Sequence, residues 1–196
     1  MSAGRFQGTG SNPQGVDPRI FVDKLDDLYM YCCDIYQSIN HGQSLDYTVN
    51  LDGELARTRD FLGAVNAVMN AGKSLGQQGY DPYAWLHPVN GFQGAAIQLG
   101  IWESKYDTSG WDLGAGNFKA SALEAATTSY WNGFVNRIDS SDSVDAAYVM
   151  TLENPNYQDM LAGDPPVNVP EPGSLLLVGA ALAGLAITRR KKQRSA

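Results

Sequence analysis

The segment GFQGAAIQLGIWESKY, residues 91–106, constrains the fold most, because as a helix it is apolar around most of its circumference. One apolar stripe at helical spacing comprises Phe92, Ala95, Leu99, Trp102 and Tyr106, and Ile97 and Ile101 continue it round the other side. Such a helix must be covered by other elements, so we expect it to be largely buried. Gln98 lies on the same flank as Trp102, one turn away, and an unpaired buried amide costs about 1 to 3 kcal/mol. Gln98 therefore needs either hydrogen-bond partners or a chemical reaction.

The remaining patterns place strands on both sides of a group of helices. Period-two alternation or β-type composition predicts strands at 28–39, 44–51 and 144–152, and helical spacing predicts helices over 54–70, 91–106 and 118–138. Strands at both ends with about three helices between them predict one α+β domain. A C-terminal transmembrane helix would be added to that domain.

Composition divides the chain into four parts. We expect a flexible leader at 1–18, the folded domain at 19–153, a proline-rich linker at 154–172 and a sorting or transmembrane segment at 173–196. The polar start has no apolar core of the kind that a secretory signal peptide requires. We therefore expect the natural start to be truncated or misplaced in this sequence.

The two cysteines, Cys32 and Cys33, are adjacent in an apolar strand pattern. Neighbouring side chains of a strand point to opposite faces, so a joint role as metal ligands or redox partners is disfavoured. The spacing lacks the two-residue gap of zinc or redox motifs, and His41 and His87 are isolated. No metal site and no cofactor are predicted, and we expect Cys33 to be a packing residue.

Charge excludes one class of partner. Residues 1–169 contain 20 acidic and 9 basic side chains. Such an acidic body repels phosphate backbones, so no nucleic-acid partner is expected.

The C-terminal end combines an uncharged apolar run from Leu175 to Thr188 with a basic cluster. This order predicts a membrane anchor whose basic end stays cytoplasmic. Together with Pro170, Glu171 and Pro172, the tail closely resembles the PEP-CTERM sorting signal. The resemblance implies export, recognition by an exosortase-type processing enzyme, and delivery to the cell surface or extracellular matrix of a Gram-negative bacterium.

Two short segments resemble the thioester domain of bacterial surface proteins, in which a cysteine is cross-linked to a glutamine. The matching residues are Tyr31, Cys32 and Asp34 in the first segment and Ile97, Gln98, Ile101 and Trp102 in the second. Ile97 stands where members of that family often have a threonine before the glutamine. The resemblance implies a thioester between Cys32 and Gln98, with Tyr31, Asp34 and Trp102 in supporting positions.

The implied function is single-use covalent attachment rather than catalysis. An amine on a surface or matrix polymer would displace Cys32 and form an amide at Gln98. Tyr31 or Tyr36 could donate a hydrogen bond to the oxyanion, and each could equally be structural. One alternative is a structural surface or matrix protein of the same sorting class without a cross-link. A second is a cysteine hydrolase or transpeptidase, which would need a histidine at the Cys32 thiol.

Overall fold

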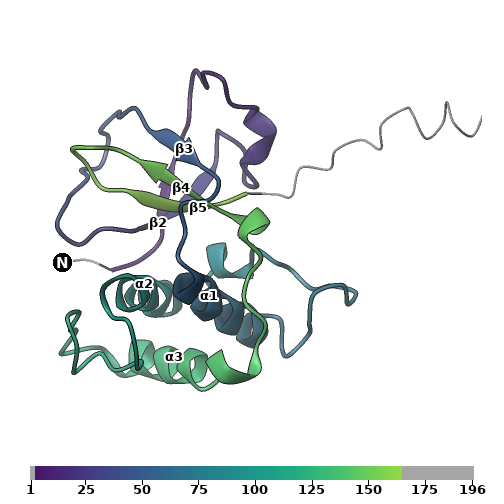
Figure 1. Ribbon diagram of the computed structural model, residues 1–196, viewed down its shortest axis with the longest axis vertical. Coiled ribbons are helices and arrows are strands. Elements are labelled where there is room, and N and C mark those ends of the chain that lie inside the picture. The colour runs from purple at the N-terminus through teal and green to yellow at the C-terminus, as the bar shows by residue number, and fades with distance from the viewer. Residues whose placement is uncertain (1–2, 165–196) are drawn as a thin grey trace, which may run out of the picture. The chain divides into compact units, whose positions relative to one another are not determined.

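The computed structural model describes residues 3–164, which form an antiparallel sheet lying on a layer of helices (Figure 1). The sheet has five strands in the order β1-β2-β5-β4-β3, namely β1 (Phe6–Gly8), β2 (Leu28–Cys32), β3 (Thr48–Asn50), β4 (Val149–Glu153) and β5 (Met160–Gly163). The helices are α1 (Ala56–Met69), α2 (Gly91–Tyr106) and α3 (Ala125–Val135), with short 3-10 turns at Pro18–Ile20, Ala84–Leu86, Ile138–Ser140 and Ala146–Tyr148. The predicted α+β class with three helices is confirmed.

Helix α2 is the central element, because it packs against α1, α3 and β2. Its observed bounds are those expected from the sequence, and the Asn90 side chain caps its start by accepting a hydrogen bond from the Gln93 N–H. Gly100 allows close packing, since a Cβ at that position would overlap the ring of Phe61 in α1. The prediction that the whole apolar stripe is buried is wrong at its first residue, because Phe92 in the first turn of α2 is 42% exposed.

The other two helices match their predictions unequally. Helix α1 begins and ends within two residues of the expected range. Helix α3 is shorter than the expected 118–138, because residues 118–124 are not helical. The Phe118 N–H donates to the Asp107 carboxylate, and Ala122 has a left-handed φ of 56°, which a continuous helix does not allow.

The strand expected over 28–39 ends at Cys32 instead. Beyond Cys33 the backbone donors leave the ladder: the Tyr36 N–H donates to the Asp34 carboxylate at 2.7 Å, and the Ile35 N–H donates to the Tyr106 hydroxyl at 3.1 Å. A side chain that accepts from the backbone two residues later forms a turn, and this turn replaces the predicted continuation. The strands expected at 44–51 and 144–152 are likewise shorter, and are β3 and β4.

The sheet contains two strands that were not predicted. β1 lies in the range assigned to the leader, and β5 lies in the range assigned to the linker. β5 pairs with both β2 and β4, so it is an interior strand of the sheet. The folded part therefore extends beyond residues 19–153 at both ends.

No helix within residues 3–164 is long and apolar enough to cross a bilayer. The predicted transmembrane helix and its basic tail lie outside the described residues.

Candidate functional site

The structure brings Gln98 of α2 against Cys32 at the end of β2, although the two residues are 66 positions apart. The Cys32 N–H donates to Gln98 Oε1 at 2.8 Å, and Gln98 Nε2 donates to the Cys32 carbonyl at 2.7 Å. Gln98 is 0% exposed. Two hydrogen bonds to one residue fix the amide plane of Gln98 beside Cys32, and we call this contact the Cys32–Gln98 site.

β1 does not reach as far as Cys32, which explains why the Cys32 backbone is free to bind a side chain. β1 pairs with β2 only as far as Phe6 opposite Met30. The Cys33 N–H donates to the Asp159 carbonyl, on the β5 side of β2, at 2.7 Å. In an antiparallel ladder successive residues direct their backbone groups to opposite edges of the strand. The N–H and carbonyl of Cys32 therefore face the edge of β2 that β1 does not cover. The Gln98 amide takes the place of the missing strand residue.

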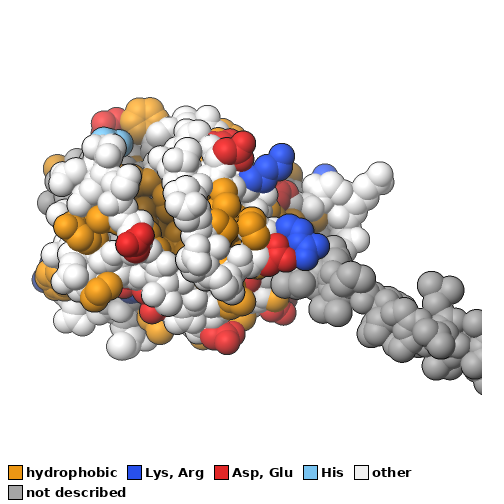
Figure 2. Space-filling view, turned by 90° about the horizontal axis from the view of Figure 1, so that it is seen from above, with side chains coloured by type: hydrophobic (Ala, Val, Ile, Leu, Met, Phe, Trp, Pro, Cys, Tyr) orange, Lys and Arg blue, Asp and Glu red, His pale blue; other side chains and the backbone are white. Residues whose placement is uncertain are grey.

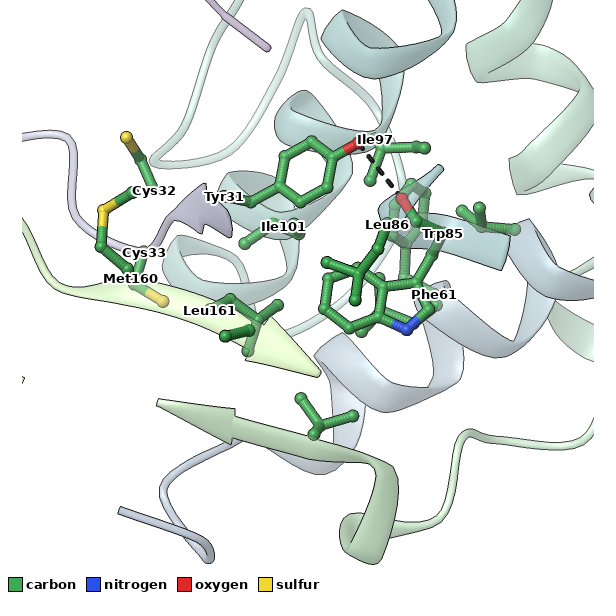
Figure 3. Close-up of a cluster of buried hydrophobic side chains, with 14 of the residues drawn as sticks. Tyr31, Cys32, Cys33, Phe61, Trp85, Leu86, Ile97, Ile101, Met160 and Leu161 are labelled. Carbon is green, nitrogen blue, oxygen red and sulfur yellow. Dashed lines mark hydrogen bonds between the residues drawn. The ribbon is translucent and has the colours of Figure 1, made fainter. Parts of the chain in front are cut away.

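Tyr31 points into the core and away from the Cys32 sulfur (Figure 3). Its hydroxyl donates to the Trp85 carbonyl at 3.2 Å, and its ring lies 6.0 Å from that of Trp85. The Tyr31 hydroxyl is thus already paired, which argues against the predicted option that it assists an oxyanion at Gln98. Tyr36, the other tyrosine considered, is 81% exposed and packs edge-on against Tyr106.

Asp34 binds the helix layer rather than Cys32. Its carboxylate accepts from the Tyr106 hydroxyl at 2.8 Å, and the same hydroxyl accepts from the Ile35 N–H. Tyr106 lies about two helical turns beyond Gln98, so α2 binds both the last residue of β2, through Gln98, and the segment after β2, through Tyr106. The sequence placed Tyr106 only in an apolar stripe; its spacing of eight residues from Gln98 was the signal that could have identified this contact.

Trp102 lies between these two anchor residues along α2. It is buried, and its ring packs against Phe118 with 5.9 Å between centroids. Its indole N–H is buried without a hydrogen-bond partner among residues 3–164. The packing is that of a core residue, and a shielding role for Trp102 stays a prediction.

The two cysteine side chains are both buried and both are free thiols. Their sulfur atoms point in different directions (Figure 3). Burial raises the pKa of the Cys32 thiol to about 12. Burial also raises the pKa of Cys33, and the nearby Lys105 opposes this effect only in part. Neither thiol is a ready nucleophile at neutral pH, so any reaction of Cys32 depends on how closely its target is held.

The histidines are engaged elsewhere. His87 lies 3.0 Å from the Asp23 carboxylate and packs edge-on against Tyr29, and His41 stacks on Phe6. No hydrogen bond joins either histidine to a thiol in the described part of the chain. The contacts of the two histidines therefore give no support to the cysteine hydrolase alternative, which needs a histidine at the Cys32 thiol. Across residues 3–164, no group of three His, Cys, Asp or Glu side chains is arranged to hold a metal ion.

Comparison with known proteins gave one match. Residues 168–191 match the PEP-CTERM protein-sorting motif, which contains the predicted Pro170, Glu171 and Pro172. Comparison with curated proteins and comparison with solved structures gave no match. The motif confirms the predicted sorting signal, and it indicates recognition by an exosortase and export to the cell envelope or surface. The chain thus carries the signal of a PEP-CTERM protein, attached to an α+β domain.

Proposed function

We propose that this exported PEP-CTERM protein forms an internal thioester between the Cys32 sulfur and the Gln98 side-chain carbonyl, and attaches through it to amine-bearing partners at the surface or in the matrix. The single observation that supports the proposal best is the pair of hydrogen bonds between the Gln98 amide and the Cys32 backbone, at 2.8 and 2.7 Å. Two groups that are held together in a suitable orientation can react as fast as if one of them were present at about 10⁵ M or more.

The chemistry balances with the groups present. The Cys32 sulfur attacks the amide carbon of Gln98, and the carbonyl π electrons move to Oε1. The Cys32 N–H already donates to that oxygen and would stabilise the negative charge as it develops. The carbon–nitrogen bond then breaks, and the amide nitrogen leaves as ammonia with the proton of the thiol. A partner amine later attacks the same carbon, and the Cys32 thiol is released.

Burial has two opposite effects on this reaction. Gln98 is fully buried and Cys32 is 5% exposed, so water has little access and hydrolysis of a thioester would be slow. The thiol pKa of about 12 means that the thiolate fraction at pH 7 is on the order of 10⁻⁵. Formation is therefore expected to be slow after folding and to accelerate about tenfold per pH unit below the thiol pKa.

A second candidate is the structural surface protein without a cross-link. It is favoured by the completeness of the contact, because the intact Gln98 amide pairs both backbone groups of Cys32. In that case Gln98 only completes the edge of the sheet. In neither candidate does the chain turn over a substrate.

The intact mass of freshly purified protein separates the two candidates. If the thioester forms, the mass is lower by one ammonia molecule. After denaturation at low pH, one cysteine instead of two then reacts with a thiol reagent. Cys32→Ala is the matched control and must restore the full amide mass, whereas Cys33→Ala must retain the loss. A full mass with two reactive thiols, persisting after incubation at raised pH, would contradict the thioester and favour the structural candidate.

A further inference from the structure

A second region of the molecule has the form of a ligand site. A cleft of about 460 Å³ lies between α1 and the segments 72–82 and 137–148, and we call it the Arg137 cleft. Its volume falls in the range of about 300 to 1,000 Å³ typical of small-molecule sites. The cleft shares no residue with the Cys32–Gln98 site, so a ligand could bind there whether or not the thioester forms.

The charge of this cleft differs from that of the rest of the folded part. Arg59, Lys73 and Arg137 line it, and they are three of only nine basic residues in positions 1–169. Two acidic residues, Asp142 and Asp145, also line it. Elsewhere acidic side chains are spread over the surface, as on the face shown in Figure 2. The excess of cations in a cleft of an acidic protein favours a bound anion.

Two hydrogen-bond donors in the walls have no partner within residues 3–164. Arg59 Nε and Ser141 Oγ are buried and have no partner among the residues that the structure describes. Each buried unpaired polar group costs about 1 to 3 kcal/mol, so an acceptor that reached these donors would bind favourably. In the described part of the chain the Lys73 ammonium has one hydrogen bond, to the Gly79 carbonyl at 3.5 Å, which leaves most of its donor capacity available.

The walls are held in place by contacts that a ligand need not supply. The Val144 N–H donates to the Arg59 carbonyl at 3.0 Å, and the Arg59 guanidinium donates to the Val144 carbonyl at 3.3 Å. Gly63 of α1 admits the Asp142 backbone so closely that any Cβ there would overlap the Asp142 carbonyl oxygen. The cleft is thus formed before a ligand binds.

The lining combines three kinds of group. Besides the cations it has hydroxyl groups of Ser74, Ser140, Ser141, Tyr80 and Tyr148, and the carboxylates of Asp142 and Asp145, which accept hydrogen bonds. Cations suit a carboxylate, whereas hydroxyl and carboxylate groups suit the hydroxyls of a sugar. We propose that the Arg137 cleft binds a sugar acid, that is, a saccharide unit with one carboxylate and several hydroxyl groups.

The test uses the full chain, titrated with glucuronate, glucose or sodium sulfate at fixed ionic strength and followed by calorimetry. Arg137 is exposed, so Arg137→Gln removes a cation from the cleft without disturbing the core. Lys119→Gln, which removes an exposed cation outside the cleft, is the matched control. We expect saturable glucuronate binding, weakened about tenfold by Arg137→Gln because a charge-assisted hydrogen bond is lost, and changed less than about twofold by Lys119→Gln.

Titrations with glucose and with sulfate test whether the cleft requires both the hydroxyl groups and the negative charge of a sugar acid. We expect each of them to bind at least about tenfold more weakly than glucuronate, because each offers only part of the complementary chemistry. The sugar-acid proposal is overturned by the absence of saturable glucuronate binding, by equal binding of glucose or of sulfate, or by an equal effect of the two substitutions.

Discussion

The Cys32–Gln98 site and the Arg137 cleft use polar groups in opposite ways. At the Cys32–Gln98 site the amide and the backbone groups that face it are paired, and Gln98 is inaccessible to solvent. In the Arg137 cleft Lys73 and Arg137 are exposed to solvent, and Arg59 Nε is buried without a partner within residues 3–164. Removing a group should therefore cost stability at the first region and cost ligand binding at the second.

The largest effect is expected for Gln98→Ala. It leaves the N–H and the carbonyl of Cys32 unpaired inside the protein and creates a cavity, so we expect a loss of about 3 to 5 kcal/mol in the free energy of unfolding. Chemical denaturation measures it. Gln93→Ala is the matched control, since Gln93 lies on the same helix, is also buried, and accepts one hydrogen bond, from the Val89 N–H. Equal losses in the two variants would contradict a special role for Gln98.

A smaller effect is expected for Tyr106→Phe. The change removes the hydrogen bond to the Asp34 carboxylate and leaves the Ile35 N–H without its acceptor, so about 2 kcal/mol of stability should be lost. Tyr130→Phe provides the comparison, because within residues 3–164 that hydroxyl has one partner, the exposed Asn90 side chain, from which it accepts a hydrogen bond. If the two variants unfolded at the same denaturant concentration, the hydrogen bonds of the Tyr106 hydroxyl would not contribute to stability.

Asp164 combines features of both regions, because Asp164 Oδ1 is buried but has no partner within residues 3–164. Burial raises the pKa of this carboxyl from 3.8 to about 6. The folded state therefore binds the proton more tightly than the unfolded state, and stability should fall as the pH rises from about 4 to about 6. The loss should be about 1 kcal/mol, less than the full shift implies because solvent screens the group.

Asp164→Asn should abolish this component of the pH dependence, as measured by denaturation at pH 4, 5 and 6. A slope that is unchanged in Asp164→Asn would assign the pH dependence to other carboxylates.

The smallest effect on stability is expected for Arg137→Gln. Arg137 is exposed, so its replacement should change the free energy of unfolding by less than about 0.5 kcal/mol. Thermal unfolding of the variant and the parent protein measures the difference. A loss comparable to that of Tyr106→Phe would mean that the cleft is held together by its cations, and the contrast between the two regions would fail.

Helix α2 shows how much of the fold local sequence can predict. Its apolar circumference required burial, and Asn90 is a residue type that favours the position before a helix, so its start was predictable. The interior position of Gln98 followed from the same pattern. Helix α3 was predicted too long because the interaction of Asp107 with Phe118 is not visible as a periodicity.

β5 and the partner of Gln98 depend on contacts that are distant in sequence. The four residues Met160–Gly163 lie in a segment with five prolines between 154 and 172, and nothing local distinguishes them from a linker. They become a strand because β2 and β4 lie on both sides of them. Similarly, the backbone of Cys32 is free to bind Gln98 only because β1 begins at Phe6, opposite Met30, and strand register cannot be read from either segment alone.

The proposed thioester makes Gln98 an electrophile, and labelling with methylamine detects that reactivity at the residue itself. The protein is incubated with methylamine under native conditions, digested, and the peptide that contains Gln98 is analysed by mass spectrometry. We predict methylamide at Gln98, none at the buried Gln93, and none at Gln98 in Cys32→Ala. An unmodified Gln98 in the parent protein, or labelling that persists in Cys32→Ala, would contradict the thioester.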